Sequence, residues 1–268
     1  MIELVDTHCH IHFSDYELDT QTVIDEAAAE GVTRLVCVGC TLEDSKLGIA
    51  MAAQHAKIWA TIGLHPHEAK HYVNDEQALQ EFHSLVRKPK VVAVGEIGLD
   101  YYYGHSERED QKKLLRFQLT VAEEHDLPVI FHVRDAKGVS PTDQQSVWTD
   151  FWAIYDEFQP KGIIHSFSAG ITEVKAILDR PKLLVGLNGI MTFTKDPDQL
   201  AAAKLVPLDR LVVETDAPFL TPTPYRGTIC QPKHVAVTAA FLSDLRGETL
   251  QQFSHATTQN AIGIFNLV

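Results

Sequence analysis

The sequence is poor in positive charge, in cysteine and in long apolar runs. Its 268 residues hold 23 Lys and Arg against 36 Asp and Glu, a net charge of −13 that repels polyanions at long range. A phosphate-bearing substrate would therefore need a local positive site. Four scattered cysteines are too few for a disulfide framework, and the apolar runs are far shorter than the ~20 residues of a membrane span. These shortages argue against a membrane protein and against a disulfide-rich secreted domain.

We expect no secretory signal, and the common cofactor motifs are missing. The first residues, MIELVDTHCHIH, carry acids and histidines where a signal peptide needs a basic start and an apolar stretch. No G-x-G-x-x-G, Walker A or G-x-S-x-G sequence occurs, which removes the usual support for a nucleotide cofactor or a nucleophile elbow. We expect a cytoplasmic monomer that binds neither a membrane nor a nucleotide cofactor.

The sequence does contain a repeat of short β-branched apolar runs, each followed by a segment with helical apolar spacing. The predicted strands are Glu3–Thr7, Arg34–Gly39, Ile58–Gly63, Val91–Glu96, Pro128–His132, Gly162–His165, Leu183–Leu187 and Leu211–Glu214. The predicted helices are Thr20–Glu30, Asp44–Ala56, Glu76–Val86, Arg108–His125, Gln144–Phe158, Thr172–Leu178 and Pro197–Lys204, with two more in Lys233–Val268.

Eight strand-helix units in about 250 residues are typical of an α/β TIM (β/α)₈ barrel. A doubly wound sheet is the competing architecture, and it usually shows a glycine fingerprint after the first strand. This chain has Asp6-Thr7-His8-Cys9-His10 at that point, and no linker interrupts the pattern. We predict a single barrel domain over residues 1–268.

The first strand ends in two histidines with one residue between them. Side chains two apart on a strand point to the same side, so His8 and His10 project together while Cys9 faces away. Two imidazoles at the active end of a barrel strand favour metal ligation over a structural role on the rim. Asp6, one step deeper, could orient a histidine, and His12, beyond the strand, is expected on the rim.

Four other strand ends carry side chains of the same kind. The fourth strand ends in Glu96, the fifth in His132 and the sixth in His165, and Asp216 follows the eighth. Catalytic groups in barrels come from the carboxyl ends of several strands. A carboxylate that ends an apolar run, as Glu96 does, is costly to bury without a cation. Either histidine alone could be a core residue, but their matched positions favour ligation.

The combined set offers four imidazoles and two carboxylates: His8, His10, Glu96, His132, His165 and Asp216. It is enough for two divalent ions bridged by one carboxylate, with positions left for water and substrate. Such a pair, about 3.5–4 Å apart, lowers the pKa of a bound water and stabilises the attacking and leaving oxygens of a hydrolysed ester. The sequence therefore predicts metal-assisted hydrolysis.

Seven motifs resemble, in the same order, those of the TatD family of metal-dependent deoxyribonucleases: DTHCHIH, IGLHPHE, GEIGLDYY, PVIFHVRDA, IIHSFSAG, ETDAPFL and PYRG. The resemblance spans nearly the whole chain and implies a barrel of the amidohydrolase type. It implies that one ion is held by His8, His10, Glu96 and Asp216, and the other by Glu96, His132 and His165. It further implies hydrolysis of DNA phosphodiesters, often from the 3′ end, with Mg²⁺ or with Zn²⁺, Mn²⁺ or Ni²⁺.

The catalytic roles are expected at Glu96, which bridges the ions, and at Asp216, which can also accept the proton of the attacking water. His65 and His67 follow the third strand and are candidates for substrate binding at a phosphate. Their alternative is loop structure, because Pro66 between them also indicates a turn.

Two arginines are further candidates for substrate binding. Arg134 and Arg226 could contact a phosphate bidentately, or could pair with Asp135 or another acid. Asp100 and Tyr101 lie just past the fourth strand, where a supporting role is as plausible as a catalytic one.

Two positions depart from the family's motifs, and one cysteine pair has no assigned function. The run Thr228–Pro232 replaces the basic residue and asparagine that usually follow PYRG, and His12 replaces the usual acid. Cys37 and Cys40 form a C-x-x-C without a second pair or a redox context, and we interpret them as small buried residues.

The chain has no basic cluster for tracking a duplex, so we expect it to act on short single-stranded DNA ends. The rival hypothesis is a small-molecule amidohydrolase that attacks an amide, a lactone or a phosphoester. Many such enzymes bridge their metals with a modified lysine at the end of strand four, whereas this chain has Glu96 there, which favours the nuclease.

Overall fold

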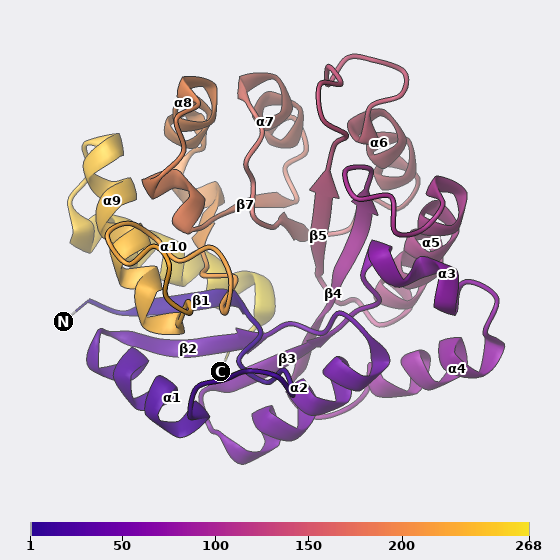
Figure 1. The fold of residues 1–268 in the computed structure, drawn as a ribbon, viewed down its shortest axis with the longest axis horizontal. Helices are drawn as coiled ribbons and strands as arrows, with labels where there is room; N and C mark the ends of the chain where they lie inside the picture. Colours follow the sequence, from indigo (N-terminus) through magenta and orange to yellow (C-terminus); the bar gives the residue numbers. More distant parts are fainter. Residues whose placement is uncertain (1, 268) are drawn as a thin grey trace.

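The computed structural model describes residues 2–267 and contains eight parallel strands in the order β1 to β8. Each strand pairs with the next along the chain, and Figure 1 shows them in the middle of the molecule with helices outside. The strands are β1 (Leu4–Cys9), β2 (Val32–Cys37), β3 (Ile58–Ile62), β4 (Val91–Asp100), β5 (Val129–Arg134), β6 (Gly162–Ile164), β7 (Leu183–Leu187) and β8 (Leu211–Val213).

Backbone hydrogen bonds join the segment after β8 to the end of β1 and so bring the sheet round into a nearly closed barrel. The Asp216 amide donates to the His8 carbonyl at 2.8 Å, and the His10 amide donates to the Ala217 carbonyl at 2.7 Å. These bonds bring the last predicted ligand, Asp216, beside the first two. The predicted TIM barrel fold is confirmed.

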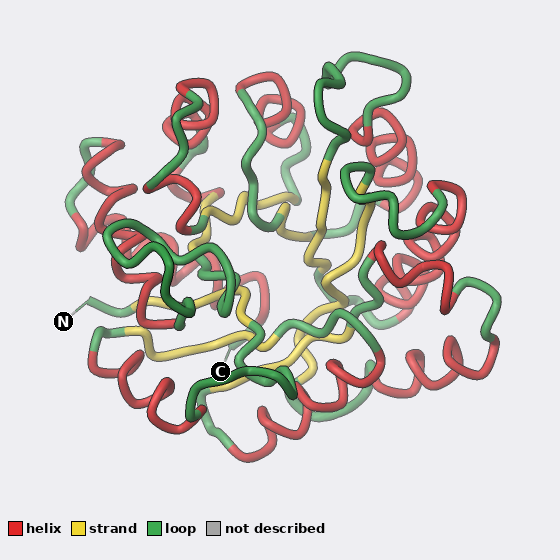
Figure 2. Tube along the Cα trace, viewed as in Figure 1, coloured by secondary structure: helices red, strands yellow, loops and turns green. Residues whose placement is uncertain are grey.

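Helices cover the outside of the barrel, and Figure 2 shows them as a ring around the strands. The longer ones are α1 (Thr20–Ala29), α2 (Leu42–Gln54), α4 (Glu76–Leu85), α5 (Arg108–Glu124), α6 (Val147–Phe158), α7 (Ile171–Leu178), α8 (Pro197–Leu205), α9 (Val235–Arg246) and α10 (Leu250–Phe265). Polar caps start several of them, because their side-chain oxygens accept from an otherwise unpaired amide; Asp19, Thr41 and Ser146 do so for α1, α2 and α6. No helix in residues 2–267 has the length and apolar character that crossing a membrane requires.

The predicted elements match the structure to within a few residues, with one larger difference at the fourth strand. Prediction ended this strand at Glu96, but β4 continues to Asp100 because Gly98, Leu99 and Asp100 pair with β5. A short α3 (Ala69–Tyr72) after a 3₁₀ turn at Pro66–Glu68 is also additional.

The barrel interior is filled with side chains from its strands and is closed at one end by α10. Val5, Val36, Ile130 and other strand residues form one buried cluster with Phe265. The α10 residue Asn260 donates to the Leu211 carbonyl, where β8 begins, which places the helix across the amino-terminal end of the strands. The opposite, carboxyl-terminal end is left for a site.

Candidate metal centre

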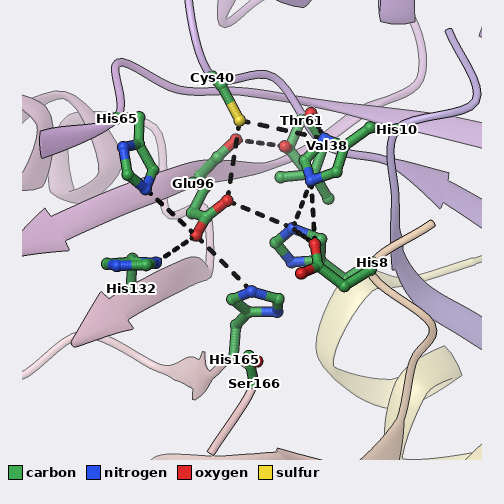
Figure 3. Close-up of polar contacts among 12 residues, drawn as sticks. His8, His10, Val38, Cys40, Thr61, His65, Glu96, His132, His165 and Ser166 are labelled. Atoms are coloured by element: carbon green, nitrogen blue, oxygen red, sulfur yellow. Dashed lines mark hydrogen bonds and ion pairs between the residues drawn. The ribbon is translucent and has the colours of Figure 1, made fainter. Parts of the chain in front are cut away.

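A cavity of about 730 Å³ opens at the carboxyl-terminal end of the barrel. Its lining includes five of the six predicted ligands, namely His10, Glu96, His132, His165 and Asp216. The sixth, His8, is fully buried directly beneath, with its Nε2 3.1 Å from the His10 Nε2. The structure thus brings all six predicted ligand side chains together, from β1, β4, β5 and the segments that follow β1, β6 and β8. Figure 3 labels all of them except Asp216.

Glu96 stands between two groups of ligands, and each of its carboxylate oxygens faces one group. The Oε2 atom lies 3.3 Å from the His8 Nε2. On the same side, Oδ1 of Asp216 lies 3.3 Å from the His10 Nε2 and 3.7 Å from the His8 Nε2. These four side chains form the first group.

The Oε1 atom of Glu96 faces the second group. It lies 2.7 Å from the His132 Nδ1 and 3.6 Å from the Nε2 atoms of both His165 and His65. Figure 3 shows these three imidazoles around one oxygen of Glu96. A carboxylate that presents one oxygen to each of two nitrogen-rich groups has the geometry needed to bridge two cations.

The ligand rings are oriented by partners on their far sides, as in protein metal sites. The His10 Nδ1 lies 2.8 Å from the Val38 carbonyl, an acceptor, so this nitrogen carries the proton and Nε2 is left as the ligand atom. The His132 Nε2 lies 2.9 Å from Asp100, which leaves Nδ1 to face Glu96. The His165 Nδ1 lies 2.8 Å from the buried Glu214. The free ring nitrogens therefore point inward, and the donor set fits two divalent cations.

Without cations, these carboxylates raise the pKa values of two imidazoles. Burial opposes a charge on His132, yet its hydrogen bonds to Asp100 and Glu96 raise its pKa to about 9. Burial likewise opposes a charge on His165, but Glu214 and Glu96 raise its pKa to about 10. Burial would raise the pKa of Glu96, and the charge of His165 instead holds it well below its ordinary value. Protons and metal ions therefore compete for the same ligand atoms.

Three of the four predicted substrate-binding residues line the cavity. Burial lowers the pKa of His65 to about 4, so its ring is neutral. The His65 Nδ1 accepts the His67 amide, which leaves an Nε2–H donor aimed into the site. The His67 Nε2 lies 3.1 Å from Asp100. Arg134 forms no ion pair with a carboxylate among residues 2–267, and its guanidinium lies over the rings of Tyr102 and Tyr103, 4.3 and 4.8 Å from their centres.

The fourth predicted substrate-binding residue, Arg226, lies apart from the cavity lining. Its guanidinium donates to the Thr221 carbonyl at 2.8 Å and lies over the Phe193 ring at 3.9 Å. These contacts hold Arg226 to its own loop and to the segment that follows β7.

Three residues take places that differ from the sequence-based expectation. Asp6 does not orient a histidine ring, because its carboxylate accepts from Thr215 and from the His8 amide. His12 is not on the rim; it is 5% exposed, and burial lowers its pKa to about 3. Cys37 is buried as expected, but Cys40 lines the cavity, with its Sγ 3.7 Å from Glu96.

The sequence analysis also left out residues that contact the predicted ligands. It treated Asp100 as undecided and gave Glu214 no role, although an acid two residues before Asp216 was a readable signal. It missed an H-E-x-x-H sequence, His67 to His71, which is typical of zinc proteases. His71 is exposed and lies outside the cavity lining, so this pair does not form such a site.

Comparison with known proteins gives one consistent result. The family model described as TatD related DNase matches residues 5–266. The metal-dependent hydrolase YabD of Bacillus subtilis is 34% identical, with 98% of this chain and 99% of that protein aligned. The 3′-5′ ssDNA/RNA exonuclease TatD of Enterobacter lignolyticus is 31% identical, over 93% and 94%. The crystal structure of the TatD homologue YjjV from Escherichia coli superimposes with a TM-score of 0.88 at 27% identity, covering 99% and 98% of the two chains.

Proposed function

This chain belongs to the TatD-related DNase family of metal-dependent hydrolases, and on that premise we propose that it removes nucleotides from the 3′ ends of single-stranded DNA. One observation carries the proposal. The two oxygens of Glu96 face two separate ligand groups, an arrangement that supports a site for two cations. Two-metal sites are suited to phosphodiester hydrolysis because they stabilise both the attacking and the leaving oxygen.

Two divalent ions, with Mg²⁺ as the proposed species, supply an activated water and a positive field for the phosphate when bound. His8, His10 and Asp216 would hold one ion, His132 and His165 the other, and Glu96 both. Zn²⁺, Mn²⁺ and Ni²⁺ also suit this mixed set of nitrogen and oxygen ligands.

The protein's own side chains then bind the substrate and move the proton. Asp216 lines the cavity and is suited to orient the attacking water and accept its proton. The neutral His65 can donate its Nε2–H to a phosphate oxygen, and the guanidinium of Arg134, which no carboxylate pairs, can bind a second one. His67, held by Asp100, lies beside them.

The preference for single-stranded ends rests on the size and position of the cavity. Its 730 Å³ volume at the end of the barrel accommodates a few nucleotides, and a base pair would have to open before an internal duplex phosphate reached Glu96. Opening costs about 1.4 kcal/mol per base-pair step. The name of the Enterobacter relative, an exonuclease of single-stranded DNA and RNA, supports the same direction and strand preference.

The test is a substrate panel with metal-depleted protein reloaded with Mg²⁺, Mn²⁺, Zn²⁺ or Ni²⁺. A 5′-labelled single-stranded oligonucleotide should give a ladder that shortens from the 3′ end, faster than the matching blunt duplex. Elemental analysis of the reloaded protein should give two ions per chain. Hydrolysis of a lactone or an amide without cleavage of any phosphodiester would instead establish the small-molecule amidohydrolase.

A further inference from the structure

Few large apolar side chains are exposed in the described part of the chain, and two of them lie at the mouth of the metal cavity. They are Ile2, Tyr102, Tyr103, Leu205, Phe219 and Tyr225. Phe219 is the most exposed of them, at 53%, and it lines the cavity together with Tyr103. Burying an aromatic ring stabilises a fold, and an exposed ring does not contribute this free energy. The exposure of Phe219 beside the predicted ligands therefore suggests a role in binding.

The backbone around Phe219 is held firmly, so the exposure of its ring does not come from a loose loop. The Phe219 amide donates to the Asp216 carbonyl at 2.8 Å. The two preceding residues accept hydrogen bonds across the loop: the Ala217 carbonyl from the His10 amide at 2.7 Å, and the Pro218 carbonyl from the Cys230 amide at 3.0 Å. Phe219 is thus fixed three residues from one ligand, with its ring 6.4 Å from the ring of another, His10.

The ring of Phe219 is also free for a ligand, whereas the two other Phe and Tyr rings of the described lining, Phe13 and Tyr103, are already engaged. The Phe13 ring stacks on the His10 ring, with 4.5 Å between the ring centres. Tyr103 stacks on His105 at 5.6 Å, and the Arg134 guanidinium lies 4.8 Å from its centre. Within residues 2–267, Phe219 has no stacked aromatic ring and no cation over its face. An open face beside the ligands is therefore available at Phe219.

Charge at the cavity gives a second, independent reason to expect stacking. Among the described lining residues, Arg134 is the one lysine or arginine, against five acids: Asp44, Glu68, Glu96, Asp100 and Asp216. A cavity lining with this charge attracts the phosphates of a nucleic acid only weakly, apart from the metal ions. Proteins that bind single strands combine basic contacts with aromatic rings on which bases stack, and here the aromatic part must contribute more.

We propose that Phe219 stacks on the base of the nucleoside next to the scissile phosphodiester. This inference rests on the proposed function and deepens it, since it makes a base-bearing, unpaired nucleotide the unit that the site recognises. Every base has a π face, so the contact confers a requirement for a base without a preference among sequences. A base inside a duplex is stacked on its neighbours and cannot offer that face.

The experiment compares two single-stranded oligonucleotides of equal length, one of thymidines and one whose last two 3′ residues are abasic. The wild-type protein should remove the first thymidine with kcat/KM about tenfold higher than the first abasic residue. Phe219→Ala and Phe219→Leu should lose most of that ratio, mainly through KM on the thymidine substrate. Phe219→Tyr, which keeps an aromatic face, should retain it.

Tyr225→Ala is the matched control. Tyr225 is 48% exposed on the same loop but stacks on His234 outside the cavity, so its removal should leave the ratio unchanged. Equal rates for both oligonucleotides with wild-type protein, or an equal loss on both in Phe219→Leu, would overturn the stacking role while leaving the nuclease function intact. Failure of the wild type to cleave either strand with any metal would overturn the proposed function and this inference together.

Discussion

At the scale of single residues, the site depends on which atom each side chain presents. Glu96 turns one oxygen to each ligand group, while Asp100 and Glu214 turn His132 and His165 so that the opposite ring nitrogens point inward. Contacts at the ring nitrogen that faces away from Glu96 thus determine which nitrogen each imidazole presents to the predicted metal site.

Glu96→Gln should remove activity while leaving the barrel folded. The amide keeps the shape of the side chain but cannot supply a negative charge to two cations. Loss of a residue that only hydrogen-bonds to a metal ligand lowers activity by up to about 100-fold, and we expect kcat to fall by more than that here. The metal content should fall from two ions per chain to one or fewer. Steady-state kinetics and elemental analysis measure both. An unchanged turnover number would mean that Glu96 is structural.

Asp216→Asn tests the role of Asp216 as proton acceptor separately from the role of Glu96 in bridging two cations. Its amide nitrogen cannot accept a proton, so kcat should fall by about 10²–10⁴-fold even where metal content is partly retained. Single-turnover measurements at saturating metal report this step. A decrease below tenfold in metal-loaded protein would exclude Asp216 as the general base.

At the scale of secondary-structure elements, the close approach of β4 to β5 sets the distance between Glu96 and His132. Gly98 makes this approach possible, because a Cβ there would lie 1.9 Å from the His132 carbonyl oxygen and the residue has φ of +152°. The additional length of β4 therefore serves to place the second ligand group.

Gly98→Ala should destabilise the fold and displace His132. Overpacking of this kind costs about 1–3 kcal/mol, measured as a lower denaturation midpoint, and activity should fall with it. Gly263→Ala in α10 is the control, since a Cβ there meets nothing within 4 Å. That change should be neutral or stabilise by up to about 1 kcal/mol because Ala favours helix over Gly. Similar losses in both variants would argue against the strand contact.

At the scale of the whole molecule, the charged site links stability to pH. In metal-free protein, the pKa values of His132 and His165 lie near 9 and 10, above the ordinary 6.5. Between pH 6.5 and 10 the folded state therefore binds more protons than the unfolded state, and stability must fall as pH rises.

Denaturation of metal-free protein should show this loss, with a midpoint temperature that decreases from pH 6.5 to 10. Saturating Mg²⁺ or Mn²⁺ should oppose it, because a metal ion replaces the protons at the same atoms. A midpoint that rises over this range in metal-free protein would contradict the charged state of the two histidines.

The net charge of −13 and the single arginine of the cavity predict weak dependence of substrate binding on salt. With about two or three phosphate contacts, the slope of log affinity against log salt should be no steeper than about −2 for a single strand. Fluorescence anisotropy of a labelled oligonucleotide at fixed metal measures it. A steep slope would reveal a basic surface outside the cavity.

The barrel and the gathering of the six predicted ligand side chains at one end of it follow from the sequence, because both depend on local patterns. Alternation along a strand determines that His8 and His10 point to one side, and parallel strands bring Glu96, His132, His165 and Asp216 to the same end. Residues beyond the strands were less predictable, since no period governs a loop.

Only the tertiary structure decided which atoms face inward and which loop residues reach the cavity. Packing against α2 buries His12, whose ring lies where a Cβ of Gly48 would touch it, while the turn after β2 brings Cys40 to Glu96. Likewise, Arg226 donates to a carbonyl of its own loop. The backbone before Phe219 accepts hydrogen bonds from the His10 and Cys230 amides, which keep Phe219 beside His10. Such positions depend on neighbours from other strands and loops, which a local sequence pattern does not contain.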